Sequence, residues 1–503
     1  MERVKILWFG EPPSKEDGQQ AKDHGFQLAV LGPSDEPDFR FGRLATFWAT
    51  GGYFEQAAVC LKKFGSMALD EGLYVVVVVS GGIGDVRLGE VNKILREIDP
   101  HTALEAQYRV RSAPVLVHHL MNQALGYDPG PLKNQDLNID YPEGELTTTE
   151  RLLLQRAFHD CRSIRLRPIP HGYSGAKTFI VEAKLKDSNA GPEPEPFFTK
   201  LGETDKLQKE MMQFQQFAEH HIPWYLRPNF VRERCIYGVT EAVLVGNFVR
   251  NSSSLGECAH NGNGAQLIRS LFEETLAGLR RQADTPEDGT STSVVDALAE
   301  FCNHEGVPRP RWTEAAQVFG GEPVEPARLW WRLLSLPARS WRKSVVHGDM
   351  HGENVRVRKQ DAIVIDFAQA CVGPASADLA SLEVWLSFEA SNRGPVGEEW
   401  KAVIAELYST ETIDASLDNH AFIEGATWIH ACVAEIRRLA RDAVESKDEY
   451  KRVLAVYLLR QASFPANPGH PQEDEFRRTY AYWLSCQLVA SLQTAAEVTR
   501  ETA

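Results

Sequence analysis

Five consecutive valines in the run LYVVVVV, at residues 73–79, place the strongest constraint on the fold of this chain. β-Branched side chains favour strands, and a strand that is apolar at every position is buried on both faces. Similar runs stand at 4–10 and 26–32, and the segment 53–69 has the spacing of an apolar helix face. Strands alternating with helices indicate a parallel sheet with helices on both sides. We therefore expect residues 1–130 to form a doubly wound α/β domain.

The residues at the ends of these runs limit what the first domain can do. It resembles a bacterial receiver domain or a flavodoxin-like domain, and a phosphate-accepting receiver has an Asp at the end of its central strand. We take the run 73–79 as that strand, but it ends in Ser80, Gly81 and Gly82, and no acidic pair follows the run 4–10. The resemblance therefore implies a degenerate phosphorylation site and a binding role, such as contact with a protein partner.

The length and composition of the chain exclude several classes of protein. At 503 residues it exceeds a single hydrophobic core, so two or three domains are expected. Its 69 acidic and 54 basic residues give a net charge of −15, which argues against nucleic-acid binding and is compatible with a cationic substrate. The eight cysteines are scattered without a Cys-x-x-Cys pair, as in a reducing compartment. Because no signal peptide and no membrane-spanning run is present, we expect a cytoplasmic protein without membrane contact.

Residues 131–147 predict a linker, because Pro, Gly, Asp and Asn accumulate there without periodicity. The threonines at 147–149, followed by Glu150, then predict the start of a helix. Beyond residue 395 the spacing of apolar residues is helical almost throughout. Long helices are expected near 420–445, 449–463 and 474–500.

The stretch SVVHGDMHGENVRVRKQDAIVIDFAQ, residues 344–369, places acids, an amide and two histidines among apolar β segments. NVRVR and AIVIDF are expected to form a hairpin centred on Gln360, which sets Asn354 directly opposite Asp366. A neutral oxygen beside a carboxylate makes a site for a hard cation such as Mg²⁺. Asp349 lies five residues before Asn354, within reach of that site, and its carboxylate could accept a proton from a hydroxyl group.

These residues resemble the catalytic and metal-binding loops of the aminoglycoside phosphotransferase and choline kinase family. The matching motifs are HGDxHxxN at 347–354 and IDF at 365–367, which correspond to the His-Arg-Asp and Asp-Phe-Gly loops of protein kinases. The resemblance implies an α+β two-lobed protein-kinase-like domain, with a first lobe at 148–250 and a helical C-terminal lobe at 251–503. It also implies ATP and Mg²⁺ as cofactors and a hydroxyl group as the phosphate acceptor.

The same resemblance assigns roles to single residues. Asp349 would be the catalytic base, Asn354 and Asp366 would bind Mg²⁺, and His347 would support the loop. Gly348 stands where protein kinases have Arg, so the residue that reads activation-loop phosphorylation is missing.

Two other interpretations of this stretch stay open. His347, Asp349 and His351 could bind zinc in a metal hydrolase, which would require further ligands elsewhere. That interpretation leaves Asn354 and the IDF motif without a role. The stretch could also be a polar turn between two core strands.

A kinase-like fold requires a Gly-containing turn over the phosphates and a Lys on the following strand. The segment PIPHGYSGAK supplies Gly172, Ser174 and Gly175, although a turn of this kind is often only a hairpin. Lys200 follows after a polar insertion and would hold the α- and β-phosphates as a point charge. The alternative for Lys200 is a solvent-facing position on an edge strand.

A helical acid is expected to pair with that Lys. The segment 204–221 predicts a helix with Glu210 on its apolar face. A buried acid is costly unless it is paired, and Lys200 is the expected partner. Glu203, just before the helix, is the competing candidate. Residues 245–248 are the expected hinge, where adenine would bind backbone groups.

Asp378 lies in the first turn of a predicted helix that begins after Ser376. An acid there complements the helix dipole. The family resemblance implies that Asp378 also braces the catalytic loop.

The sequence thus predicts an enzyme that moves the γ-phosphate of ATP to a hydroxyl of a small molecule, or of a protein. The alternative is a weak or inactive pseudokinase that binds nucleotide in a signalling or defence assembly, because phosphate transfer does not need the N-terminal domain. Retention of Lys200, Asp349, Asn354 and Asp366 argues for activity. No pattern in the C-terminal helices identifies the acceptor.

Overall fold

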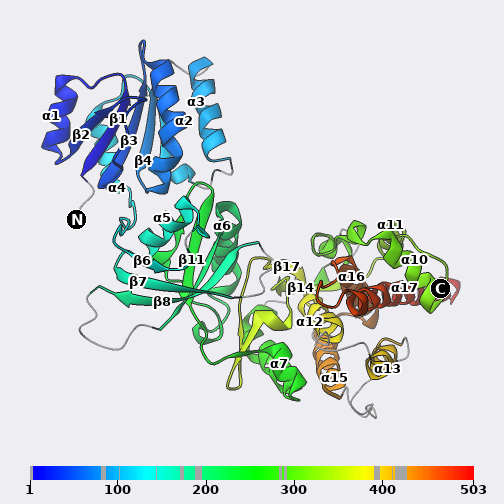
Figure 1. Cartoon of the computed structure of the whole chain (residues 1–503). Helices are drawn as coiled ribbons and strands as arrows, with labels where there is room; N and C mark the ends of the chain where they lie inside the picture. The colour runs from blue at the N-terminus through cyan, green and yellow to red at the C-terminus, as the bar shows by residue number, and fades with distance from the viewer. Residues whose placement is uncertain are drawn as a thin grey trace. The chain divides into compact units, whose positions relative to one another are not determined.

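The fold was obtained as a computed structural model, in which the chain forms two compact units (Figure 1). The first unit comprises Met1–Lys209 and Asn229–Phe248, and the second comprises Glu210–Pro228 and Val249–Ala503. The structure describes residues 4–502 except 81–85, 101, 103, 143, 170–174, 187–194, 282–285, 288–291, 390–396, 410–411 and 414–426.

The N-terminal domain is built on a parallel sheet with the strand order β2-β1-β3-β4-β5 (Figure 1). Every residue of β4 is buried, as its valine-rich sequence predicts. The central strand is β3, so our expectation that residues 73–79 form the central strand is wrong. Thr50 follows β3, and it is not the Asp of a phosphate-accepting receiver either. The strands are β1 (Lys5–Gly10), β2 (Gln27–Leu31), β3 (Gly42–Ala49), β4 (Tyr74–Val79) and β5 (Tyr108–Ser112).

Helices cover both faces of this sheet. The side chains of β4 alternate between two apolar cores, one on each face of the sheet. Val76 and Val78 belong to the core under α1 and α4. Val75, Val77 and Val79 belong to the core under α2 and α3. The domain is therefore doubly wound. The helices are α1 (Lys15–Asp23), α2 (Phe54–Asp70), α3 (Val86–Ile98) and α4 (Val117–Gly126).

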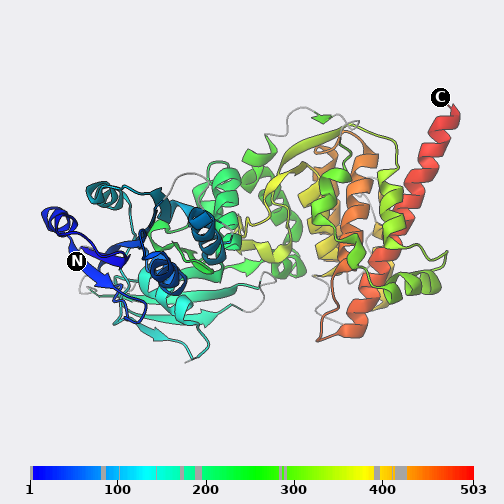
Figure 2. The same ribbon diagram turned by 90° about the horizontal axis from the view of Figure 1, so that it is seen from above.

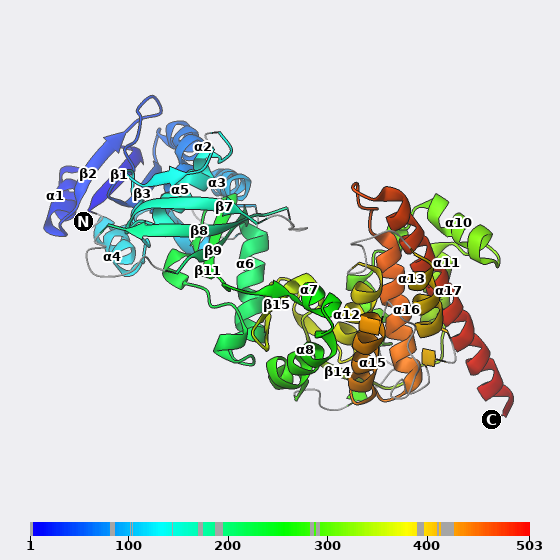
Figure 3. The ribbon, with the colours of Figure 1, turned by 60° about the horizontal axis from the view of Figure 1, so that its bottom comes forward.

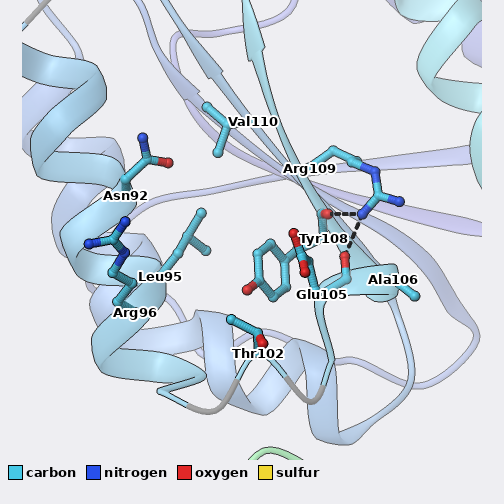
Figure 4. A pocket seen from close by; sticks show the side chains of 9 residues that line it. All are labelled: Asn92, Leu95, Arg96, Thr102, Glu105, Ala106, Tyr108, Arg109 and Val110. Carbon is cyan, nitrogen blue, oxygen red and sulfur yellow. Dashed lines mark hydrogen bonds between the residues drawn. The ribbon is translucent and has the colours of Figure 1, made fainter.

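A cavity of about 640 Å³ opens between α3 and the edge strand β5 (Figure 4). Leu95 and Tyr108 point into it, and Asn92 and Arg96 line it from α3. Arg109 points the other way and donates to the Tyr108 carbonyl oxygen at 2.7 Å. None of the predicted catalytic or metal-binding residues lines this cavity.

A second sheet in the first unit has the order β10-β11-β9-β8-β7-β6, and its pairs are antiparallel except for β6 with β7. Helix α5 (Thr148–Ala157) packs against it through Leu153 and Leu154. The predicted helix start is confirmed, since Thr147 caps α5 reciprocally with Glu150. The segment 131–147 is more than a linker, because β6 forms within it. The strands are β6 (Asn138–Asp140), β7 (Cys161–Pro168), β8 (Lys177–Leu185), β9 (Phe197–Glu203), β10 (Ile236–Tyr237) and β11 (Glu241–Asn247).

Buried polar contacts fasten the N-terminal domain to this second sheet. Arg156 on α5, 4% exposed, donates to the carbonyl oxygens of Asp70, Pro129 and Pro131, the latter two at 2.9 and 3.3 Å. The Asp70 carboxylate accepts the backbone N–H of Val239 at 2.7 Å. Val239, between β10 and β11, also packs into the core of the N-terminal sheet. The domain and the second sheet are therefore parts of one unit.

The second unit combines two small sheets with a helical region. The sheets have the orders β12-β15-β16 and β13-β14-β17. Their strands are β12 (Ser253–Ser254), β13 (Pro286–Glu287), β14 (Trp341–Val346), β15 (Val355–Arg358), β16 (Asp361–Val364) and β17 (Cys371–Pro374). The helices include α7 (Leu255–His260), α8 (Gly264–Ser270), α9 (Ala277–Arg280), α10 (Arg309–Phe319) and α11 (Pro326–Leu334). Helix α6 (Thr204–Gln213) spans the boundary between the two units.

The C-terminal part is helical, as predicted, and its core contains a buried ion pair. Glu383 of α12, with no exposed surface, accepts from Arg437 of α15 at 2.8 Å and from Tyr450 of α16 at 2.7 Å. These bonds join three helices, and α16 lies beside the long α17 (Figures 2 and 3). The elements are α12 (Ala377–Phe388), α13 (Glu398–Leu407), α15 (Thr427–Arg441), α16 (Lys447–Ser463) and α17 (Pro471–Thr502).

Two further observations bear on the predicted compartment. In the part of the chain that the structure describes, no helix has the length and apolar character needed to cross a membrane. All eight cysteines are free thiols. The cytoplasmic location itself stays a prediction.

We expect R156M to lower the free energy of unfolding by about 3 kcal/mol or more, because it leaves three carbonyl oxygens without their donor in a buried site. Urea unfolding followed by tryptophan fluorescence would measure this. The matched control is R151M, on the same helix, at a half-buried position where the backbone N–H bonds to Thr147 but the described residues show no side-chain hydrogen bond. An equal loss in both variants would contradict the role given to Arg156.

The stability of the first unit should depend on pH through Asp70. Burial raises the pKa of Asp70 to about 6, so the folded chain binds this proton more tightly than the unfolded chain. The stabilisation is therefore complete below about pH 4 and is lost as the pH rises through 6, a change of about 3 kcal/mol. D70N should remove this dependence in unfolding measured from pH 4 to 7, whereas D23N, at an exposed site on α1, should keep it.

Candidate active site

The loop after β14 is held by the carboxylate of Asp378, in the first turn of α12. Asp378 accepts the backbone N–H groups of His347 at 2.7 Å and of Gly348 at 3.0 Å. Asp378 is 5% exposed, and burial raises the pKa of its carboxyl group. The structure thus places Asp378 against the loop, where the resemblance predicted it. Ser376, at the N-cap position, makes no capping hydrogen bond with its side chain.

His347 lies fully buried beneath the loop. Its Nε2 is 3.0 Å from the carbonyl oxygen of Ile365. Its ring meets that of Phe367 edge to face, at 5.1 Å between centroids, and Phe367 in turn contacts Phe214. His347 therefore connects the loop to the segment that carries the IDF motif.

Asp349 is partly exposed, with 36% of its side chain accessible. Its Oδ1 accepts from Arg460 Nη2 at 2.7 Å, and its Oδ2 lies 3.6 Å from His351 Nε2. Burial raises the pKa of this carboxyl group, but Arg460 and His351 outweigh burial and hold the pKa below its ordinary value. Asp349 is therefore ionised at neutral pH.

The hairpin that follows differs from the prediction by one position in register. Val355 pairs with Val364 and Arg358 with Asp361, so the turn is Lys359-Gln360 and the centre lies between these two residues. Asn354 consequently stands opposite Ile365, whose N–H donates to the Asn354 carbonyl oxygen at 2.9 Å. The prediction that Asn354 faces Asp366 directly is wrong. It counted Asp361 as part of the turn, whereas Asp361 is the first residue of β16.

The backbone turns at Asp366, two residues after the end of β16. Its φ is +62°, a conformation that residues other than Gly rarely adopt and one that is concentrated at functional sites. Asn354 is 8% exposed, and its Nδ2 donates to the carbonyl oxygen of Asp349 at 3.0 Å. The amide nitrogen of Asn354 is thus engaged in this hydrogen bond, and its amide oxygen is the atom that could bind a cation.

Lys200 lies in the first unit, on β9, with 3% of its surface exposed. β9 is paired on both sides, by β8 and β11, so the alternative of a solvent-facing Lys on an edge strand is wrong. Of the predicted Gly turn, Gly175 has a φ of +72°. Gly172 and Ser174 lie outside the described residues.

Glu210 is buried on α6, with 4% of its surface exposed, and it belongs to the second unit. The competing Glu203 is exposed and pairs with Lys206 at 2.8 Å. The pairing of Glu210 with Lys200 stays a prediction. The chain passes from the first unit to the second after Phe248, at the end of the predicted hinge 245–248.

The zinc interpretation finds no support in this geometry. His347 Nε2 already faces the Ile365 carbonyl oxygen. Among the described residues, no three side chains of His, Cys, Asp or Glu are grouped as metal ligands.

Arg460 is the site residue that the sequence did not reveal. It lies near the end of α16, in the segment VLAVYLLR, and a charge that closes an apolar helical run is a signal for a buried partner. Nothing in the spacing could have identified Asp349 as that partner, since the two are 111 positions apart.

Comparison with known proteins supports the kinase-like fold of this region. Residues 269–415 match a family model described as the phosphotransferase enzyme family. That segment contains the loop after β14, the hairpin and Asp378, and over it the predicted resemblance is confirmed. No curated protein matches the sequence.

Solved structures show weaker likeness. An amicoumacin kinase is 10% identical, with 65% of this chain and 88% of that chain covered and a TM-score of 0.35. An aminoglycoside phosphotransferase from Streptomyces rimosus is 15% identical, with 57% and 97% covered and a TM-score of 0.30. A choline kinase from Cryptosporidium parvum is 11% identical, with 67% and 91% covered and a TM-score of 0.31.

G348A should disrupt the loop. The φ of Gly348 is +78°, and a Cβ there would lie 2.3 Å from the backbone oxygen of Gln369. We expect a loss of at least about 2 kcal/mol in the free energy of unfolding, from strain and from displacement of the loop. Urea unfolding would measure it, with G89A as the control. A Cβ at Gly89 of α3 meets nothing, so that variant should gain up to about 1 kcal/mol.

Proposed function

We propose that this chain, which carries the phosphotransferase segment at 269–415, transfers the γ-phosphate of ATP to a hydroxyl group of a small molecule with the help of Mg²⁺. The observation that carries the proposal is the joining of Asp349 to Asn354. The Asn354 amide donates to the Asp349 backbone oxygen at 3.0 Å, which brings the candidate base and a candidate metal ligand onto one loop.

The residues present fit a divalent cation. The Asn354 oxygen and the Asp366 carboxylate are hard oxygen ligands of the kind that Mg²⁺ uses together with substrate phosphates. The Nδ2 of Asn354 donates to the Asp349 carbonyl oxygen, which leaves the amide oxygen of Asn354 as the proposed metal ligand. When bound, the metal supplies neutralisation of the charge on the phosphates.

Asp349 is proposed to orient the acceptor hydroxyl and to take its proton. The lowered pKa keeps the carboxylate ionised, and more than a third of the side chain is accessible to an incoming molecule. His347 and Asp378 are proposed to hold the loop so that Asp349 is placed before the acceptor arrives. Phosphoryl transfer asks mainly for such positioning and for charge stabilisation.

Nucleotide binding is proposed for residues of the first unit and the segment after it. Lys200 would neutralise the α- and β-phosphates, with Glu210 as its partner. Gly172, Ser174 and Gly175 would cover the phosphates through backbone N–H groups, and residues 245–248 would hold the adenine. The low exposure of Lys200 and of Glu210 supports this, because buried charges of opposite sign require partners.

D349N should lower kcat by about 10²–10⁴-fold, the usual contribution of a general base. ADP release from MgATP would be measured with choline, glucosamine and an aminoglycoside as acceptors, and with water. ATP binding, followed by thermal shift, should be unchanged. The control is D361N, the same substitution in the hairpin that follows the loop, outside the site. If the wild-type protein binds nucleotide yet shows no turnover with any acceptor, the pseudokinase alternative holds instead.

A further inference from the structure

Arg460 touches the candidate base from a part of the chain beyond the family match, which ends at residue 415. Its Nη2 lies 2.7 Å from Asp349 Oδ1, the distance of a charge-assisted hydrogen bond. We infer that Arg460 is a positioning residue, which holds the Asp349 carboxylate through Oδ1 and leaves Oδ2 to take the proton of the acceptor. This inference rests on the proposed function.

The guanidinium of Arg460 is itself held in place by neighbouring rings. It lies 5.8 Å from the ring centre of Tyr457, one turn earlier on α16, and 5.5 Å from that of Phe464. The Ser463 hydroxyl donates to the Arg460 carbonyl oxygen at 2.7 Å, next to the end of the helix. With 18% of its side chain exposed, Arg460 has little freedom to leave Asp349.

The charge of Arg460 is directed to Asp349 and not to a structural network. Within the described residues, the ion pair that Arg460 makes is the one with Asp349. The nearby Arg478, by contrast, pairs with Glu389 and Asp474, the latter at 3.2 Å. Because the Arg460 guanidinium pairs with the Asp349 carboxylate, it orients that carboxylate.

The two oxygens of Asp349 are therefore not equivalent. Oδ1 is engaged by Arg460, whereas Oδ2 is 3.6 Å from His351 Nε2, too far for a hydrogen bond. In the transfer, the acceptor O–H bond breaks and its proton passes to Oδ2, and from there to water. The acceptor oxygen forms a bond to the γ-phosphorus as the bond from that phosphorus to the ADP oxygen breaks. Arg460 stays on Oδ1 throughout.

The test compares R460Q and R460K with the wild-type protein, in ADP release from MgATP with the acceptor that gives the highest turnover, or with water. R460Q should lower kcat by about 10²-fold, the cost of a misplaced catalytic group, with the KM for ATP within about twofold. R460K keeps the charge but lacks the planar fork, so its kcat should fall between those of R460Q and wild type.

The matched control is R438Q, which removes an arginine from a more exposed ion pair with Glu273 and Glu435 on the surface of α15. Its kcat should stay at the wild-type value, and thermal unfolding would confirm that all variants are folded. A kcat for R460Q within twofold of wild type would overturn the inference while the proposed function stands. A kcat for R460K as low as that for R460Q would overturn it as well. Absence of turnover in the wild-type protein would instead reject the proposed function.

Discussion

One carboxylate, that of Asp378, determines where the loop after β14 can lie. The backbone turns at Gly348, where φ is positive, so the N–H groups of His347 and Gly348 cannot join a strand or a helix. Asp378 accepts both of them from the first turn of α12. Buried N–H groups left without acceptors would cost several kcal/mol. The position of the loop is therefore fixed relative to α12.

The helices near the loop are joined to one another, and one of them, α16, contacts Asp349 through Arg460. Glu383 joins α12 to α16 through Tyr450, and to α15 through Arg437. Helix α12 carries Asp378, and α16 carries Arg460. Asp378 and Arg460, which both contact the loop after β14, thus stand on helices that a buried ion pair and a hydrogen bond hold together. The same group of helices therefore holds the backbone of the loop, through Asp378, and the Asp349 carboxylate, through Arg460.

The sequence predicted the elements whose signals are local. The valines of β4, the cap of α5 and the C-terminal helices were found because their patterns are continuous. The central strand β3 was missed because Arg43 and Thr46 interrupt its apolar residues. The hydrogen-bond partners of Arg43 are distant in the sequence. Its guanidinium donates to the carbonyl oxygens of Ala124, Leu125 and Tyr127 at the end of α4.

The site residues also divide into those with a local sequence signal and those that depend on distant contacts. Asp349, Asn354 and Asp366 were found from their spacing, but the hairpin register was off by one because the turn has two residues and not three. In a hairpin that error changes which side chains face each other. Arg460 could not be found, because its contact with Asp349 depends on how the C-terminal helices pack.

The attachment of the N-terminal domain through Arg156 has a mechanical consequence. Lys200 stands on a sheet that shares one compact unit with that domain, so rotation of this sheet has to carry the whole domain with it.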